Sequence, residues 1–318
     1  MTLSYDPPSV VNDSTSQKHK SIKLAETDCV IDSQVSLSKG TSFRVGGPAE
    51  WYVTPRRVED LQASVEWANS QKLPITLLGA GSNLLISDRG IPGLVICTRY
   101  LRYFQFDDKT GQVTASAGEP LARLAWQAAD RGWQGLEWSV GIPGTVGGAV
   151  VMNAGAHDRC TAELLVNTKV LSADGSIEVL TPEDLQFSYR TSILQHNPRL
   201  VLEATFQLQP GADPVEVTAA THQDFEQRRL TQPYNYPSCG SVFRNPLPYH
   251  AAWLVQQTGL KGYKVGGAQV SNLHANFIIN CGSATASDIL QVMRHVQQQV
   301  KERWSVHLEP EVKMIGEF

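Results

Sequence analysis

A short segment, "SCGSVFRNP" at residues 238–246, brings together side chains that could take part in chemistry. It contains two serines, a cysteine, an arginine and an asparagine, and prolines stand at positions 237 and 246. Hydroxyl groups in such turns usually bond to nearby backbone groups. One of these side chains could instead take part in chemistry. The composition of this segment alone favours the turn and leaves the chemistry open.

A first glycine-rich stretch, "GAGSNL" at residues 79–84, follows the apolar run "PITLL". Glycines there let a ligand approach the backbone closely, and successive N–H groups can bind an anion. The third glycine of the Rossmann fingerprint is absent, so that dinucleotide-binding motif is excluded. On the residues alone, a plain tight turn and an anion site are equally compatible with this stretch.

A second stretch, "GIPGTVGGA" at residues 141–149, continues into "MNAGA" at 152–156. Its small residues leave room for a flat ring system or a pyrophosphate to lie against the main chain. The alternative is close packing of one chain segment on another. Because such a segment can hardly build a dense core by itself, the sequence favours a bound partner here.

Charge and cysteine usage exclude several classes of protein. The 27 Lys and Arg residues face 31 Asp and Glu residues, and the net charge of -4 provides no basic field for nucleic acid. The five cysteines are scattered and never form C-x-x-C, which argues against a disulfide framework and a zinc-thiolate site. No apolar run approaches the length of a membrane span. We therefore expect a cytoplasmic protein without a metal and without membrane or nucleic-acid partners.

The pattern along the chain predicts an α+β protein with three units after a Pro- and Ser-rich start. The first unit is a β-α-β arrangement, with a strand pair in "TSFRVGGPAEWYVTP" at 41–55 and a helix between residues 56 and 74. The predicted boundaries are a mobile extension at 1–34, a first unit at 35–92, a second at 93–212 and a third at 213–318.

The second unit is predicted to be rich in short strands, the first of them "GLVICT" at 93–98, with helices only near 119–133 and 182–189. The third unit is predicted to hold a strand at 274–282 and three helices. These helices are expected at 213–230, 248–259 and 285–304.

Several of these segments, taken in order, resemble a known family. The segments "TSFRVGGPAEW", "LGAGSNLL" and "GIPGTVGGAVVMNAGA" are similar to the FAD-binding region of the UDP-N-acetylenolpyruvoylglucosamine reductases, also called UDP-N-acetylmuramate dehydrogenases. The resemblance continues to the C-terminus and covers nearly the whole chain from about residue 35. It extends through "SYRTS", "PSCGSVFRNP", "GGAQVS" and "EPEVKMIGE".

The resemblance implies a two-part FAD-binding region of the vanillyl-alcohol-oxidase type, formed by the first two units. A C-terminal α+β substrate-binding domain follows, and the last residues can return to the first unit. FAD is expected to be held noncovalently, so His157 is given no covalent flavin link. The expected cofactor-binding residues are Gly79, Ala80, Gly81, Ser82, Asn83, Leu84, Gly141, Ile142, Pro143, Gly144, Thr145, Gly147, Gly148, Asn153 and Gly155.

The family reaction implies roles for three further residues. NADPH reduces FAD, and the enolpyruvyl ether of UDP-N-acetylglucosamine enolpyruvate is then reduced to the lactyl ether of UDP-N-acetylmuramate for peptidoglycan synthesis. Arg190 is expected to hold the enolpyruvyl carboxylate and Ser241 to donate the proton, with Arg244 as a neighbour that could stabilise the alkoxide. Glu311 is expected to polarise the enol system or assist proton delivery, and Glu309 is its alternative.

The substrate contacts follow more loosely from the resemblance. Arg228 is expected to lie close to the nucleotide sugar, and its neighbour Arg229 is the alternative for this role. The chain between residue 210 and the "SCGSVF" segment is short, which indicates the form of the family without an extra tyrosine-bearing loop. We expect a monomer. The expected substrate-binding residues are Tyr189, Arg228, Asn245, Lys264, Gln269 and His274.

Two other functions share part of this pattern. An FAD-dependent oxidase of the same fold would use oxygen in place of NADPH, and it has no need of Arg190, Ser241 and Glu311 together. A noncatalytic module that binds flavin or a nucleotide sugar would have no need of these residues either. The three residues therefore favour the reductase.

Overall fold

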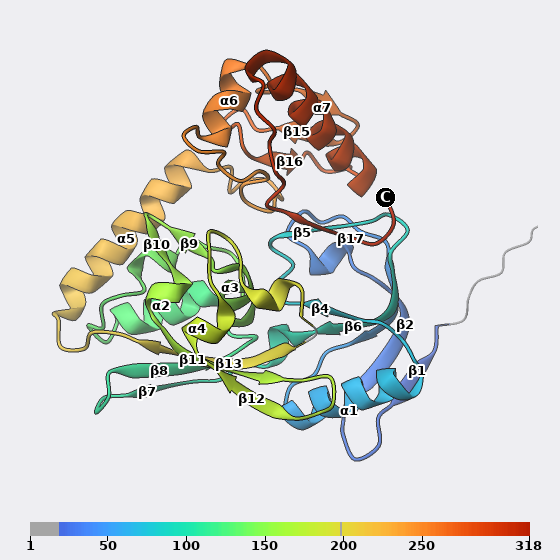
Figure 1. Ribbon diagram of the computed structural model, residues 1–318, viewed down its shortest axis with the longest axis vertical. Helices are drawn as coiled ribbons and strands as arrows, with labels where there is room; N and C mark the ends of the chain where they lie inside the picture. The colour runs from blue at the N-terminus through green and yellow to red at the C-terminus, as the bar shows by residue number, and fades with distance from the viewer. Residues whose placement is uncertain (1–18, 198) are drawn as a thin grey trace, which may run out of the picture.

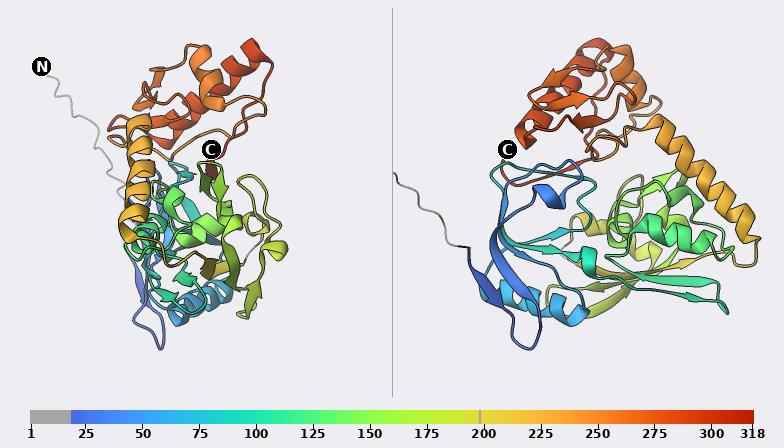
Figure 2. Two further views of the ribbon diagram at one scale, coloured as in Figure 1. Left: turned by 90° about the vertical axis from the view of Figure 1, so that its left-hand side faces the viewer. Right: turned by 180° about the vertical axis from the view of Figure 1, so that it is seen from behind.

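The computed structural model describes residues 19–197 and 199–318, and it contains three units built from sheets and helices (Figure 1). The first 18 residues of the predicted N-terminal extension lie outside the described residues. The third unit stands at one end of the molecule, and the other two lie together at the opposite end, as the view from behind also shows (Figure 2).

The first unit is a five-stranded sheet in the order β1-β2-β3-β6-β4. Helix α1, Val58–Ser70, packs its apolar side chains on the sheet, with Leu61 and Ala68 fully buried against strand residues such as Leu94. The strands are β1 Ser21–Lys23, β2 Val30–Ser36, β3 Pro48–Val53, β4 Ile75–Leu78 and β6 Ile91–Cys97.

Three expectations for the first unit need correction. Strands β1 and β2 lie largely within residues 1–34, which were predicted to be a mobile extension. They instead belong to the first sheet, because β1 pairs with β2 and β2 pairs with β3. The predicted boundary at 92/93 falls inside β6, which pairs with β3 and β4 and so belongs to the first sheet. Residues 41–47 form a loop rather than a strand, because Arg44 and Gly46 take positive φ angles of 58° and 126°.

The second unit is an antiparallel five-stranded sheet in the order β12-β11-β13-β8-β7. Apolar residues of helices α2, Leu121–Ala129, and α3, Val146–Met152, share a core with this sheet. Helix α4, Pro182–Leu185, is shorter than predicted because Gln186 turns left-handed at φ 47°. The strands are β7 Phe104–Asp107, β8 Gln112–Ser116, β11 Leu165–Leu171, β12 Ile177–Leu180 and β13 Leu200–Gln207.

The third unit combines a small sheet in the order β14-β15-β16 with two helices, α6, Ala251–Gln257, and α7, Ala286–Trp304. A third helix, α5, Pro214–Thr231, was predicted here, but it lies along the second unit and connects the two (Figure 1). Its His222 ring lies 4.6 Å from the Trp126 ring of α2. The sheet strands are β14 Lys264–Val265, β15 Ala268–Val270 and β16 Ile278–Asn280.

The end of the chain returns from the third unit to the first. Strand β17, Lys313–Ile315, pairs in parallel with β5, Leu84–Ile86, directly after the first glycine turn. The residues just before β17 therefore lie where the units meet. Smaller elements are the hairpin β9 Gly155–Ala156 and β10 Arg159–Cys160, and the 3₁₀ helices Ser38–Gly40, Thr98–Tyr100, Glu137–Ser139, Thr161–Glu163 and Ile193–Gln195.

Within the described part of the chain, no helix is both long and apolar enough to cross a bilayer.

Candidate active site

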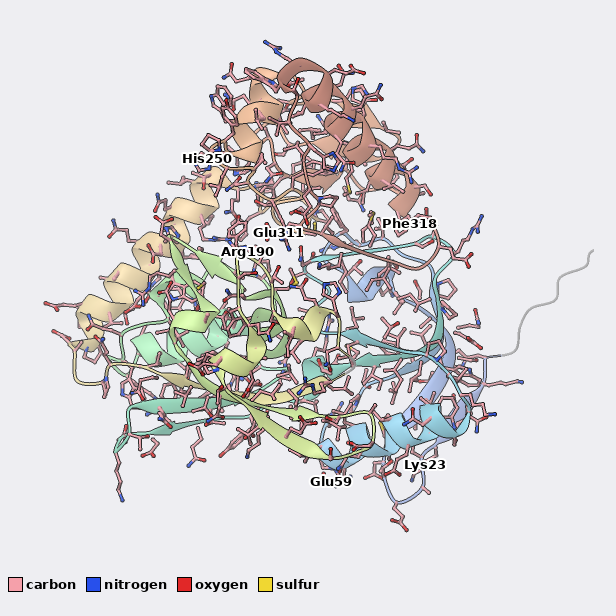
Figure 3. All side chains as sticks on the ribbon, viewed as in Figure 1. Lys23, Glu59, Arg190, His250, Glu311 and Phe318 are labelled. Carbon is pink, nitrogen blue, oxygen red and sulfur yellow. The ribbon has the colours of Figure 1, made fainter. Side chains whose placement is uncertain are left out.

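A large cavity of about 990 Å³ is lined by residues from all three units. The first glycine turn, the second glycine turn and the "SCGSVF" segment each contribute to its wall. Figure 3 shows Arg190 and Glu311 next to each other where the third unit meets the other two. This cavity is the candidate active site, because the sequence motifs that suggest chemistry converge on it.

The two glycine turns approach each other at the wall of the cavity. A Cβ atom placed on Gly79 would lie 2.9 Å from Oγ1 of Thr145, and one placed on Gly144 would lie 3.2 Å from Oγ of Ser82. The approach of Thr145 therefore requires a glycine at position 79.

The first turn also offers free hydrogen-bond donors. Among the described residues, the backbone N–H groups of Ala80, Gly81 and Ser82 donate to no protein acceptor. Three successive N–H groups of this kind can hold a phosphate or pyrophosphate. The donor set, the glycines and the cavity volume fit the predicted FAD.

The second turn opens directly into helix α3. The Thr145 hydroxyl caps this helix by accepting a hydrogen bond from the Gly148 N–H at 3.3 Å. A Cβ atom on Gly147 would lie 2.9 Å from Cβ of Ala117, whereas one on Gly148 would meet only the Thr145 hydroxyl at 3.6 Å. Gly148 is exposed and lines the cavity, so the space above it is available to a ligand.

The cavity is lined by every predicted cofactor residue except Gly141 and Asn153. The Gly141 carbonyl instead accepts a hydrogen bond from the Tyr234 hydroxyl at 3.0 Å. The Asn153 side chain bonds the backbone of Ser188 and Ala162, and its left-handed φ of 42° ends helix α3. These two residues shape the surroundings of the cavity and do not face it.

Arg190 enters the cavity from the turn that follows helix α4. Its Nε donates to Oε1 of Glu311 at 3.1 Å, and its Nη2 donates to the Gly155 carbonyl at 2.5 Å. The side chains of Arg190 and Glu311 are 20% and 16% exposed, so water screens this ion pair only partly. Arg190 thus presents a fixed positive charge to the cavity.

Glu311 lies just before β17 and is held in place by its own backbone, whose N–H donates to the Val242 carbonyl at 2.8 Å. Burial raises the pKa of the Glu311 carboxyl, and the positive charges of Arg190, Arg244 and Lys313 oppose that rise. The alternative carboxylate, Glu309, has a 66% exposed side chain and does not line the cavity. The geometry therefore favours Glu311 over Glu309.

Ser241 lines the cavity from a segment that is fixed on both sides. On one side, Phe243 forms an antiparallel bridge with Pro310, next to Glu311. On the other side, the buried Asn276 holds the Phe243 backbone with two side-chain hydrogen bonds of 3.0 and 2.8 Å. The Ser241 backbone is therefore kept close to the Arg190–Glu311 pair.

Cys239 precedes Ser241 by two residues and also lines the cavity, but its thiol is a poor candidate for chemistry. Burial, and to a smaller degree the charge of Glu311, raises the pKa of the Cys239 thiol well above its usual range. The thiol therefore stays protonated at neutral pH. Gly240 lies between the two residues with a φ of 81°, a conformation that favours glycine.

Three predicted substrate residues, Tyr189, Arg228 and Asn245, line the cavity. The Arg228 Nε is buried and has no hydrogen-bond partner among the described residues, so its guanidinium retains binding capacity. Arg229 does not line this cavity; it pairs with Glu226 at 3.0 Å on the exposed side of α5 and borders a separate hollow of about 470 Å³. The structure thus distinguishes the two neighbouring arginines.

The other predicted substrate residues, Lys264, Gln269 and His274, do not line this cavity. Lys264 and Gln269 are paired on strands β14 and β15, and Gln269 faces a second hollow of about 470 Å³. Nδ1 of His274 accepts a hydrogen bond from the Asn276 backbone, which gives this histidine a structural contact. Burial and the charges of Lys261 and Arg228 lower the pKa of His274.

Lys313 and Asn276 also line the cavity, although neither was predicted from the sequence as a site residue. Lys313 could have been found from its position two residues after Glu311, since alternate residues of an extended segment share a face. Burial, with the charge of Arg244, lowers the pKa of Lys313. Asn276 gave no local signal, because its partner Phe243 is 33 residues away in sequence.

Comparisons with known proteins agree with this geometry. The chain matches two family profiles, one described as FAD binding domain at residues 49–181 and one as UDP-N-acetylenolpyruvoylglucosamine reductase, C-terminal domain, at residues 232–315. Proteins named UDP-N-acetylenolpyruvoylglucosamine reductase are similar over almost the whole chain. One from Nostoc sp. is 63% identical and covers 96% of this chain and 93% of its own. One from Acaryochloris marina is 59% identical and covers 95% of this chain and 98% of its own.

A solved structure with the same fold is the UDP-N-acetylenolpyruvylglucosamine reductase of Thermus caldophilus. It superposes with a TM-score of 0.76 at 35% sequence identity, and the match covers 89% of this chain and 98% of that one. Together with the two family profiles, this similarity confirms the predicted α+β fold with an FAD-binding region and a C-terminal substrate domain.

Proposed function

The chain belongs to the UDP-N-acetylenolpyruvoylglucosamine reductase family, and on that premise we propose that it reduces UDP-N-acetylglucosamine enolpyruvate with NADPH, using Ser241 as the proton donor. It is an FAD-dependent oxidoreductase of peptidoglycan precursor synthesis. One observation carries the detailed proposal: Arg190, Ser241 and Glu311, from three distant segments, line the same cavity as the two glycine turns.

The two glycine turns would hold FAD. The free N–H groups of Ala80, Gly81 and Ser82 would be available to its pyrophosphate, and the surface above Gly148 leaves room for the cofactor. When bound, FAD would supply the redox chemistry, the transfer of a hydride from NADPH to the terminal vinyl carbon of the substrate. The chain itself provides charge, a proton and position.

Arg190 binds the substrate carboxylate and stabilises the charge that develops beside it. As hydride arrives at the vinyl carbon, the carbon that bears the carboxylate becomes enolate-like, and a guanidinium can bond both carboxylate oxygens. Glu311 keeps this guanidinium in place through the 3.1 Å ion pair. The raised pKa of Glu311 also suits a group that assists proton delivery.

Ser241 donates the proton to the carboxylate-bearing carbon. A hydroxyl is a weak acid in water, so the donation requires a fixed position and nearby positive charge. The bonds from Asn276 and the pairing with the Glu311 segment supply the position. The cationic side chains of Arg190 and Lys313, which line the cavity, supply the charge.

The UDP-sugar is bound by the third unit and helix α5. Tyr189, Arg228 and Asn245 line the cavity around the reacting groups. Arg228 is suited to a phosphate or sugar oxygen, because its buried Nε has no protein partner within the described chain.

Anaerobic spectroscopy tests this function. NADPH should bleach the yellow flavin of the purified protein, and UDP-N-acetylglucosamine enolpyruvate should restore the colour. An oxidase would instead regain its colour with oxygen and not with the enolpyruvyl substrate. A protein that stays colourless after incubation with FAD would contradict the proposal.

A further inference from the structure

Arg244 follows the "SCGSVF" segment but is absent from the described residues that line the cavity. Its side chain is 19% exposed and lies behind the turn that carries Arg190. Nη2 of Arg244 donates to the Arg190 carbonyl at 3.1 Å and to Oγ1 of Thr191 at 3.2 Å. Arg244 therefore contacts the backbone of the Arg190 turn, not the space where substrate binds.

The Arg190 turn needs such support. Arg190 has a φ of 55°, a left-handed conformation that is unfavourable for a residue with a Cβ atom. Backbone bonds between Ser188 and Thr191 close the turn. Its central carbonyl, that of Arg190, is bonded from two sides by Nε2 of Gln195 at 2.9 Å and by Arg244. Because Gln195 belongs to the second unit and Arg244 to the third, the turn is held from both units.

The backbone of Arg244 is itself fixed to the segment that carries the catalytic carboxylate. Its N–H donates to the Glu309 carbonyl at 2.9 Å, two residues before Glu311. One residue thus joins the Ser241 segment, the Glu311 segment and the Arg190 turn. A shift of the third unit relative to the second would strain these bonds.

We infer that Arg244 is a positioning residue that acts through Arg190, a deepening that rests on the proposed function. It holds the Arg190 turn so that the guanidinium faces Glu311 and the substrate carboxylate. Arg244 also fixes the position of the Arg190 guanidinium relative to the Ser241 hydroxyl, because Ser241 lies three residues before Arg244 in the same segment. Arg244 itself contacts neither the substrate nor the reacting atoms.

The geometry of arginine matters in addition to its charge. Nε of Arg244 is buried without a hydrogen-bond partner in the described chain, and the nearest carboxylate oxygen, Oε1 of Glu309, is 3.9 Å away. The hydrogen bonds of its guanidinium therefore go to the turn, and its ion pair with the exposed Glu309 side chain is long. Lysine would keep the positive charge but lacks the rigid fork, so Arg244→Lys separates charge from positioning.

A double-mutant cycle on the holoenzyme tests this inference. The rates of FAD reduction by NADPH and of flavin reoxidation by UDP-N-acetylglucosamine enolpyruvate are measured separately by stopped flow. Arg244→Met is expected to slow reoxidation about tenfold or more, to leave FAD reduction within about twofold, and to be partly rescued by Arg244→Lys. In the Arg190→Gln background, Arg244→Met should add less than about a twofold effect, because its target is already lost.

Independent, multiplying effects of Arg190→Gln and Arg244→Met would overturn the inference, as would equal slowing of both half-reactions. If Arg244→Met does not fold, Thr191→Val and Arg244→Lys carry the same cycle, because Thr191→Val removes the bond to Oγ1 of Thr191 and Arg244→Lys weakens both bonds to the turn. Arg89→Met is the matched control for charge loss, since the Arg89 side chain is 78% exposed and its one ion pair within the described residues is with Glu317 near the C-terminus. Failure of the wild-type enzyme to reoxidise with the substrate would refute the proposed function itself, which separates the two failures.

Discussion

The guanidinium of Arg190 and the carboxylate of Glu311 form a 3.1 Å ion pair, although 121 residues separate them in the sequence. The pair joins the turn after α4 to the segment that leads into the last strand, β17. Burial alone would favour the protonated form of Glu311, and Arg190 is the largest of the charges that oppose this. The pair therefore sets both the position of the cationic group and the protonation of the acidic one.

Glu311→Gln should slow substrate reduction by about 10²–10⁴-fold, the usual contribution of a group that takes part in proton transfer. Flavin reduction by NADPH should change little, because that step does not require the proton. Glu309→Gln is the matched control, since its side chain is 66% exposed, and it should stay close to wild type. Stopped-flow rates of both half-reactions check this prediction. If Glu309→Gln slowed substrate reduction more than Glu311→Gln, Glu309 would be the catalytic carboxylate.

Gly148→Ala should weaken FAD binding by about tenfold or more, because a methyl group there enters the cofactor space. The apoprotein should fold normally, since the added Cβ meets only the Thr145 hydroxyl, at 3.6 Å. Gly147→Ala is the contrasting variant, because its Cβ would lie 2.9 Å from Ala117 and should lower the melting temperature of the apoprotein. FAD titration and thermal melting check both, and unchanged FAD affinity in Gly148→Ala would place the flavin elsewhere.

Arg228→Met should raise the KM for the UDP-sugar substrate about tenfold or more with a smaller change in kcat, as expected when a charge-assisted bond to substrate is lost. Arg229→Met should leave both constants near wild type, because Arg229 pairs with Glu226 on the exposed face of α5. Steady-state kinetics with varied substrate distinguish them. The reverse pattern would show that Arg229 is the ligand.

His274 should make the protein lose stability in acid. Its folded pKa lies below the usual value of about 6.5, because it is buried and faces Lys261 and Arg228. As pH falls below 6.5 the unfolded chain takes up this proton first, so the free energy of unfolding decreases. Protonation of Nδ1 also breaks the bond from the Asn276 backbone. Urea unfolding at pH 7 and pH 5 should show a smaller loss for His274→Gln than for wild type, and equal losses would contradict this.

Local patterns predicted most helices well. The predictions for α5 and α7 lie within a few residues of their observed bounds. The capping residues Asp213 and Thr285 mark where these helices begin, and α7 also carries a long periodic apolar pattern. Strand membership was harder. The apolar run of β6 is compatible with either sheet, and only its long-range pairing with β3 and β4 assigns it to the first.

The candidate site depended on the resemblance more than on local chemistry. Arg190, Ser241 and Glu311 stand in segments whose composition also suits surface turns, and no local rule brings them together. Their convergence arises from the return of β17 to β5 and from the bridge between Phe243 and Pro310. The supporting bonds from Asn276 and Arg244 connect residues more than 30 positions apart, so no sequence spacing indicated them. The predicted monomer stays a prediction.

Ser241→Ala tests whether Ser241 is the proton donor. Both half-reactions are followed by flavin absorbance in anaerobic stopped flow, with Ser238→Ala as the matched control from the same segment, since Ser238 is not among the described residues that line the cavity. We expect Ser241→Ala to leave FAD reduction by NADPH nearly intact and to slow reoxidation by UDP-N-acetylglucosamine enolpyruvate by about 10²–10⁴-fold. Near-normal reoxidation, or equal slowing of both steps, would contradict the role of Ser241 as the proton donor.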